Sequence, residues 1–247
     1  MKNTFQFEFH ALYYLVGLFC LLLGYFKDFI WISMLIIVHE CGHVTGAILS
    51  NWNIEKVVIL PFGGITLLSE HLNRPAYQEW GIVLLGPLYQ MIFWWILCIL
   101  NYNNPTFTMY HFILLGFNLL PMIPLDGSKI LQLILERFFS YKHAKYIGLW
   151  ISIVFLIMLG GYTVYSRNII LGVILLFMIK ENWIFYHAIP YQMDKFLLER
   201  YLHSFAFSKI KKINGIHLEK MKRGYMHLFY ICGEWKTEQD ILQNYYG

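Results

Sequence analysis

The stretch Leu35-Ile-Ile-Val-His-Glu-Cys-Gly-His-Val-Thr-Gly-Ala47 sets a His-Glu-x-x-His motif inside a run of apolar residues. On a helix, His39 and His43 lie four residues apart on one face, so their two imidazoles can converge on one ion. Glu40 lies beside them as a candidate general base for a metal-bound water. The motif therefore predicts zinc-hydrolase chemistry in a segment that should cross a membrane.

A simpler interpretation exists for each histidine alone. A single His in an apolar helix is more often a hydrogen-bonded core residue than a metal ligand. Two His and one Glu at this spacing are different, because ionisable groups are costly in hydrocarbon and usually mark a functional site there. The structural interpretation therefore carries little weight for the three residues together.

The composition places the chain among membrane proteins. Of its 247 residues, 58% are hydrophobic and 14% are charged, and the mean hydropathy is +0.50. These values exclude an ordinary soluble domain. The net charge of +4 is modest, so we expect no direct nucleic-acid partner. The four cysteines lack Cys-x-x-Cys spacing and are expected to be small hydrophobic residues, not disulfides or thiolate ligands.

Apolar runs predict six transmembrane helices, at about 11–26, 29–50, 79–101, 107–125, 145–165 and 168–188. Basic residues concentrate in the loop before Lys145 and in the tail beyond Pro190, whereas the loop from Asn101 to Thr106 carries no charge. By the positive-inside rule, this asymmetry predicts that both termini are cytoplasmic.

A β-hairpin is expected between the second and third spans. The segment from Lys56 to Ser69 contains two β-prone runs on either side of Gly63-Gly64, and a two-residue Gly-Gly loop is a good hairpin signal. The segment is too short for a pair of spanning helices and too apolar for a simple solvent loop. We expect it to lie against the protein or to dip into the membrane. A surface hairpin unrelated to function is the alternative.

The fourth span ends in Asn118-Leu-Leu-Pro-Met-Ile-Pro-Leu-Asp-Gly127. Pro121 and Pro124 remove backbone donors and disfavour regular helix before them. Asp126 therefore emerges at a break in a membrane helix, where it can supply a third ligand and leave a fourth position for water. Alone, Pro-Leu-Asp-Gly is an ordinary turn at a helix end. Together with the two histidines it is much more specific.

These motifs resemble the site-2 family of intramembrane zinc metalloproteases, and the resemblance covers the chain to about Pro190. Within that family the chain is most similar to the stage IV sporulation protein FB group, the enzymes that process pro-sigma factors in endospore formers. The resemblance implies Zn²⁺ held by His39, His43 and Asp126, with Glu40 as the catalytic acid/base. It also implies regulated intramembrane proteolysis of a membrane-associated pro-sigma factor during sporulation.

The substrate-binding residues expected from the resemblance and from the hairpin are Asn118, Pro124, Gly63, Gly64, Ile65 and Thr66. Asn118 and Pro124 would shape the approach of the substrate, and the hairpin would offer an edge on which an extended substrate pairs. One departure concerns Gln90, which follows Gly86-Pro87-Leu88-Tyr89 where many family members carry Asn. This departure leaves the role of Gln90 open.

The fold class expected is an α-helical polytopic membrane protein with about six transmembrane helices, a β-hairpin between the second and third, and a small cytoplasmic α/β tail. Residues 1–192 would form the transmembrane metalloprotease domain. Residues 193–247 would form an abbreviated or divergent cystathionine-β-synthase-like domain, with a helix end leading into a strand within His227–Ile231 and a closing helix from Thr237 to Tyr245. The basic residues of the tail would meet either anionic lipid or the substrate.

The expected partners are a membrane-associated protein substrate, membrane inhibitor proteins, a nucleotide at the C-terminal domain, the lipid bilayer and a second copy of the chain. The expected location is a bacterial inner or forespore-surrounding membrane. A transporter or proton pathway is the alternative function, because His39, Glu40 and Asp126 could act as a relay. A metal-binding scaffold without activity is a third hypothesis, although a scaffold does not require Glu40.

Overall fold

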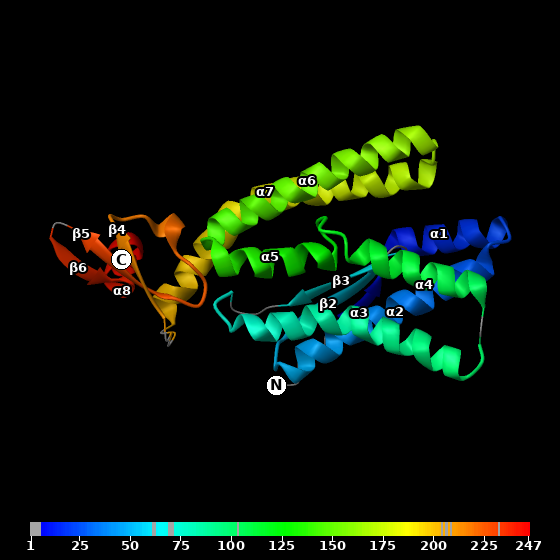
Figure 1. The fold of residues 1–247 in the computed structure, drawn as a ribbon, viewed down its shortest axis with the longest axis horizontal. Helices are drawn as coiled ribbons and strands as arrows, with labels where there is room; N and C mark the ends of the chain where they lie inside the picture. The colour runs from blue at the N-terminus through cyan, green and yellow to red at the C-terminus, as the bar shows by residue number, and fades with distance from the viewer. Residues whose placement is uncertain are drawn as a thin grey trace. The chain divides into compact units, whose positions relative to one another are not determined.

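A computed structural model describes residues 6–60, 63–68, 72–102, 104–203, 205, 207, 209–231 and 233–247. The chain divides into two compact units (Figure 1). The first comprises Met1–Glu70 and Tyr77–Leu119, and the second comprises His71–Ala76 and Leu120–Gly247.

The first unit combines apolar helices with a small sheet. Its elements are β1 (Gln6–Phe9), α1 (Ala11–Leu22), α2 (Phe26–Leu49), β2 (Ile54–Leu60), β3 (Gly63–Leu68), α3 (Ala76–Ile99) and α4 (Pro105–Asn118). Buried apolar residues of α2, β2 and α3 form one core cluster, which includes Ile36, Val57 and Ile82. The sheet is therefore packed against the helix that carries the histidine motif.

The sheet has the order β1-β2-β3, with β1 parallel and β3 antiparallel to β2. β1 was not expected, because a four-residue strand far from its partner leaves no local hairpin signal. The prediction that Gly63-Gly64 forms the loop is wrong, since the register pairs Leu60 with Gly63 and Ile59 with Gly64. Both glycines belong to β3, and the connecting residues 61 and 62 lie outside the described part of the chain.

Two glycines let α2 and α3 approach each other closely. A Cβ at Gly42 would lie 2.3 Å from the carbonyl oxygen of Leu85, and a Cβ at Gly46 would lie 2.8 Å from the Cα of Ile82. Such small residues at i and i+4 are typical of helices that pack closely in membranes. The backbone and side chains of α3 consequently reach the histidines of α2.

The first helix of the second unit is α5 (Asp126–Phe138), which the apolar runs of the sequence do not predict. It continues with α6 (Tyr141–Ser166) and α7 (Ile169–Leu202), and it ends with β4 (Ile210–Asn214), the 3-10 helix η1 (Leu218–Lys220), β5 (Met226–Ile231), β6 (Glu234–Thr237) and α8 (Glu238–Tyr246). The sheet order is β4-β5-β6, and Thr237 and Asp240 form a capping box at the start of α8. α7 continues through Pro190 and across the domain boundary expected between residues 192 and 193. The division into domains 1–192 and 193–247 therefore stays a prediction.

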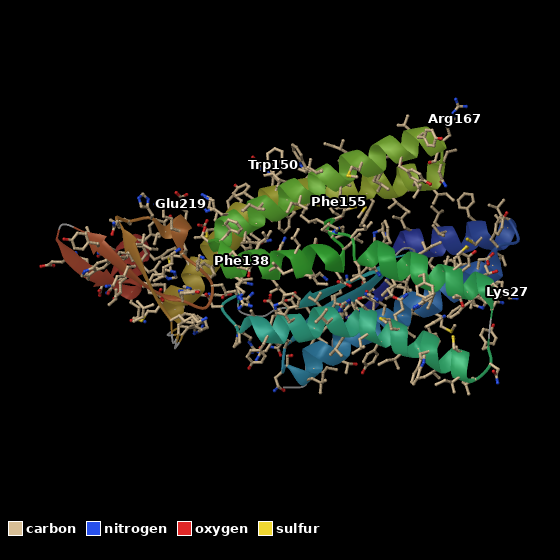
Figure 2. The ribbon with its side chains drawn as sticks, viewed as in Figure 1. Lys27, Phe138, Trp150, Phe155, Arg167 and Glu219 are labelled. Atoms are coloured by element: carbon tan, nitrogen blue, oxygen red, sulfur yellow. The ribbon has the colours of Figure 1, made fainter. Side chains whose placement is uncertain are left out.

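Among the described residues, four helices are long and apolar enough to cross a membrane: α2, α3, α6 and α7. Large apolar side chains on α6, such as Trp150, are exposed in the chain, as expected of a helix that faces lipid (Figure 2). The expected spans at 11–26 and 107–125 contain only α1 and α4, with 12 and 14 residues. α4 ends at Asn118 because Pro121 and Pro124 disfavour helix beyond it, so the prediction of a fourth span reaching residue 125 is wrong. Six full spans are not confirmed.

A buried polar network holds the connection between β3 and α3 to the C-terminal part of the second unit. Arg200, which is 1% exposed, donates from Nε to Oδ1 of Asn73 (2.7 Å) and from one terminal nitrogen to Oε2 of Glu238 (2.9 Å). The same Glu238 oxygen accepts from Nδ1 of His227 (3.0 Å), whose Nε2 accepts from the backbone N–H of Lys222 (2.9 Å). His227 is therefore held as a neutral ring, and burial lowers its pKa below the ordinary value.

A second arginine fixes the same connection. Arg223 donates two hydrogen bonds to the carbonyl oxygen of Arg74, at 3.2 and 2.7 Å, and one to Oε2 of Glu136 in α5, at 3.3 Å. Glu136 also forms an ion pair with Lys145 of α6, at 3.3 Å. Residues 73 and 74 are thus anchored by side chains that lie more than a hundred positions later in the chain.

Candidate metal centre

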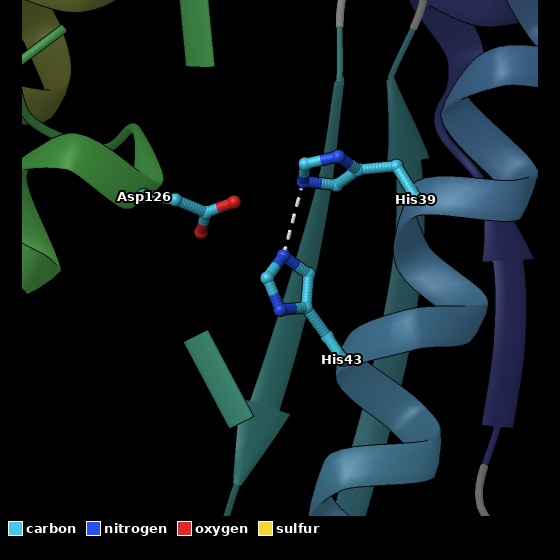
Figure 3. A group of neighbouring side chains, drawn as sticks. All are labelled: His39, His43 and Asp126. Carbon is cyan, nitrogen blue, oxygen red and sulfur yellow. Dashed lines mark hydrogen bonds between the residues drawn. The ribbon is translucent and has the colours of Figure 1, made fainter. Parts of the chain in front are cut away.

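The two histidines of the motif face each other from one side of α2 (Figure 3). His39 and His43 are 2% and 4% exposed, and their Nε2 atoms lie 3.1 Å apart. A four-residue spacing on a helix places two side chains one above the other, as the sequence predicts. The pair is therefore buried and aimed at a common point.

The opposite ring nitrogens identify the tautomer of each histidine. His43 Nδ1 lies 2.9 Å from the carbonyl oxygen of Ile82, which can only accept a hydrogen bond, so Nδ1 carries the hydrogen. His39 Nδ1 lies 3.0 Å from Oε1 of Gln90. The amide nitrogen of Gln90 donates to the carbonyl oxygen of His111 at 3.1 Å, which leaves Oε1 to accept from His39. In both neutral rings, Nε2 is therefore the nitrogen that carries a lone pair.

Two nitrogen lone pairs that lie 3.1 Å apart repel each other but can both bind one cation. A hydrogen bond between the two Nε2 atoms would need a second proton on one ring, because both Nδ1 positions already face acceptors. Neutral imidazoles that donate from Nδ1 to a carbonyl and present Nε2 are the usual arrangement of histidine metal ligands. The donor set therefore fits zinc.

The third candidate ligand is Asp126, the first residue of α5 (Figure 3). It is 6% exposed, and its Oδ1 accepts from Nζ of Lys129 at 3.0 Å. His39, His43 and Asp126 each offer one ligand atom suited to a metal ion. Two imidazoles and one carboxylate are a ligand set known from catalytic zinc sites. The histidines belong to the first unit and Asp126 to the second.

Glu40 is held by the edge of the sheet. Its Oε2 accepts from Oγ1 of Thr66 at 3.0 Å, and the side chain is 5% exposed. A Cβ at Gly64 would lie 2.3 Å from Cδ of Glu40, so only glycine leaves room for the carboxylate there. Glycine inside a strand often marks such a close approach. This contact explains why β3 carries a glycine at position 64.

Three residues of this cluster were not predicted to be in the site. Gly86 of α3 touches the imidazoles, since a Cβ there would lie 2.4 Å from Nε2 of His43 and 3.0 Å from Nε2 of His39. Gln90 is fully buried and binds His39, which answers the question that the Asn-to-Gln departure left open. His111 stacks on Trp94 with ring centroids 5.2 Å apart and supplies the carbonyl that orients Gln90. Of the three, only Gln90 could have been noticed in the sequence, because it places an amide side chain in an apolar helix one turn after Gly86-Pro87.

The structure brings five of the predicted residues together in the first unit. These are His39, Glu40, His43, Gly64 and Thr66. Gly63 and Ile65 belong to the same strand, β3, and Asn118 is buried at the C-terminal end of α4. Pro124 lies in the second unit, two residues before Asp126, after a cis peptide bond. Substrate binding by these residues stays a prediction.

Comparison with known proteins identifies relatives among both curated sequences and solved structures. No protein-family model matches the chain. It is 31% identical over 203 residues to stage IV sporulation protein FB of Bacillus subtilis, covering 78% of this chain and 70% of that protein. It is 32% identical over 163 residues to a zinc metalloprotease of Methanocaldococcus jannaschii, covering 60% of this chain and 46% of that one. The solved site-2 protease of M. jannaschii shares the fold, with a TM-score of 0.59 and 24% identity over 74% of this chain and 92% of that chain.

Proposed function

The chain belongs to the site-2 protease family of zinc metalloendopeptidases, and on that premise we propose that His39, His43 and Asp126 hold its zinc and that Glu40 moves the protons of peptide hydrolysis. The protein is an integral membrane protease whose cofactor is Zn²⁺. The observation that carries the assignment is the pair of Nε2 lone pairs 3.1 Å apart, each fixed by a hydrogen bond on the other side of its ring.

When bound, zinc supplies Lewis-acid activation of a water molecule and of the scissile carbonyl. Glu40 accepts the proton of the attacking water and passes it to the nitrogen of the leaving amine. Thr66 fixes the carboxylate of Glu40 through Oε2. Gln90 and the carbonyl of Ile82 keep the hydrogens on Nδ1 and thereby the ligand atoms on Nε2.

The substrate is proposed to enter as an extended strand. A helical peptide hides its scissile carbonyl, so the cleaved segment must first lose its helical hydrogen bonds. In the described sheet β3 lies at one edge, and the same strand contacts Glu40 through Gly64 and Thr66. Pairing of the substrate with β3 would therefore place an extended backbone beside the proton carrier. Asn118 and Pro124 are proposed to shape its approach.

A membrane-associated pro-sigma factor is the proposed substrate class. This proposal is supported by the similarity to a sporulation protein and by the basic residues of the C-terminal segment. The distribution of Lys and Arg supports cytoplasmic termini, and the apolar runs of the sequence support six membrane crossings, two of them made by the shorter helices α1 and α4. Inhibitor proteins, nucleotide binding and self-association stay predictions that no observation supports.

The assignment is tested by co-expressing the full chain with candidate membrane-associated pro-sigma factors and by measuring zinc in the purified enzyme. We expect cleavage by the native chain. For Asp126→Ala, we expect lower zinc occupancy and lower cleavage, because one of three ligands is removed and two histidines remain. Full zinc content together with full turnover in that variant would remove Asp126 from the site.

Edge pairing is tested separately with two substitutions at one position. Thr66→Val removes the hydroxyl that binds Glu40, and Thr66→Pro removes the hydroxyl and also the backbone donor. We expect cleavage by the proline variant to be several-fold lower than that by the valine variant, with equal zinc content. Equal cleavage of a natural substrate by the two variants would reject strand pairing and leave only the hydroxyl contact.

A further inference from the structure

Two polar side chains in apolar helices bind the backbone of a single residue, Ile123. Its N–H donates to Oγ of Ser152 in α6 at 2.9 Å, and its carbonyl oxygen accepts from Nδ2 of Asn182 in α7 at 3.1 Å. Ser152 is fully buried and Asn182 is 5% exposed. Both helices are candidate membrane spans. Polar groups inside such helices are costly, so their common partner requires an explanation.

Ile123 lies in the irregular connection between α4 and α5, three residues before Asp126. Irregular backbone at membrane depth needs protein groups to satisfy its hydrogen bonds. Pro121 and Pro124 on either side of Ile123 have no N–H, which limits what the connection can satisfy internally. Ser152 and Asn182 supply an acceptor and a donor from outside it.

The side chain of Ile123 is fixed as well as its backbone. It is 5% exposed and belongs to a core cluster with Leu149 of α6 and Ile189 of α7. Closer to Asp126, the N–H of Leu125 donates to the carbonyl of Met122 at 2.7 Å, which makes a short turn that leads directly into α5. The connection is thus short and stiff from the anchored residue to the carboxylate.

We infer that Ser152 and Asn182 are positioning residues that fix the carboxylate of Asp126 for metal binding by clamping the backbone of Ile123. The inference rests on the proposed role of Asp126 as a zinc ligand. Both side chains bind the backbone of Ile123, so they act through the peptide chain. Geometry errors of about 1 Å at a reacting centre are enough to cost a large factor in rate.

The test measures zinc affinity by competition with a chelator, and kcat and KM separately, on the full chain in detergent. For Ser152→Ala and Asn182→Leu we expect roughly tenfold weaker zinc affinity, as for residues that orient metal ligands. At saturating zinc we expect a lower kcat with little change in KM. Unchanged zinc affinity in both variants would overturn the inference.

A double-mutant comparison separates positioning from general damage. If Ser152 acts through Asp126, then Ser152→Ala has no further effect on zinc affinity when Asp126 is already alanine. An additional tenfold loss in that background would show that Ser152 acts elsewhere. Leu156→Ala is the matched control, because Leu156 is a buried residue of α6 outside the core cluster that contains Ile123, Leu149 and Ile189, so the substitution removes packing elsewhere on the same helix. It should lower the melting temperature and leave zinc affinity unchanged.

The same measurements distinguish this inference from the proposed function. If Asp126→Ala itself leaves zinc affinity unchanged, the ligand assignment fails and the inference falls with it. If Asp126→Ala weakens zinc binding while Ser152→Ala and Asn182→Leu do not, only the clamp is rejected. If one of these two variants fails to fold, the other decides, since each removes a different hydrogen bond to Ile123.

Discussion

Two buried histidine clusters in this molecule differ in how their nitrogens are used. In the second unit, His227 donates from Nδ1 to Glu238 and accepts at Nε2 from the N–H of Lys222. In the first unit, His39 and His43 also donate from Nδ1, but their Nε2 atoms face each other. All three rings are nearly inaccessible to solvent.

The comparison shows that burial of polar groups does not by itself identify a metal site. Buried polar groups in proteins normally find partners of the opposite kind, and the cluster around Arg200, Glu238 and His227 follows that rule. The cluster around His39 directs two acceptors at one point. The direction in which the ring nitrogens point therefore distinguishes the structural cluster from the candidate metal site, and each cluster should respond differently to substitution.

The largest expected effect is on turnover, from Glu40→Gln. The change keeps the shape of the side chain and removes its ability to carry a proton, so we expect cleavage to fall by about 10²–10⁴-fold. Zinc content and melting temperature should match those of the native chain. Loss of stoichiometric zinc would instead assign Glu40 a structural role.

The next effect is on stability and belongs to the other cluster. Arg200→Leu leaves Glu238 buried without its charged partner, which typically costs about 3–5 kcal/mol in the free energy of unfolding. Denaturant unfolding of the full chain would measure this loss. The double substitution Arg200→Leu with Glu238→Gln removes both charges and should recover part of the stability. An unchanged unfolding free energy in the single variant would contradict the structural role.

A smaller effect is expected from Gln90→Leu, which removes the hydrogen-bond partner of His39, a candidate zinc ligand. The variant removes the acceptor for Nδ1 of His39, so we expect zinc affinity to fall by roughly 10–100-fold. His111→Phe is the comparison variant, because it keeps the backbone carbonyl to which Gln90 Nε2 donates at 3.1 Å and removes only the longer contact of that nitrogen with the ring Nδ1, at 3.5 Å. Similar zinc affinities for the two variants would show that the Gln90 contact does not orient His39.

The smallest effect is a pH dependence confined to the structural cluster. Burial lowers the pKa of His227 from its ordinary value of 6.5, with the hydrogen bond to Glu238 opposing that shift. As the pH falls, the unfolded chain therefore protonates at this histidine before the folded chain does. The stability that neutral His227 contributes is fully present above the ordinary pKa of 6.5 and is lost as the pH falls below it. The melting temperature of the native chain should decrease between about pH 7.5 and 5.5 by more than that of His227→Gln. Parallel decreases would exclude His227 as the cause.

The sequence was sufficient to place the two histidines on one helix face and to indicate the membrane character, because both depend on local patterns. Apolar runs gave the four long helices, and the spacing of His39 and His43 gave their common face. Gln90 lies 51 residues from its partner His39, and Ile82 lies 39 residues from His43. Such pairs depend on how helices pack, which no local pattern encodes. α5 was missed because it is amphipathic, with charged residues such as Lys129 and Arg137 among its apolar ones, so it lacks the continuous apolar run that marks a span.

The anchoring of residues 73 and 74 has a consequence for biosynthesis. These residues connect the strand that contacts Glu40 to the helix that carries Gln90. Their partners Arg200 and Arg223 follow 127 and 149 positions later. At about 5–20 residues per second, a ribosome needs roughly 6 to 30 seconds to add that length. The first unit can therefore insert into the membrane early, but its central connection obtains these hydrogen bonds only when the end of the chain emerges.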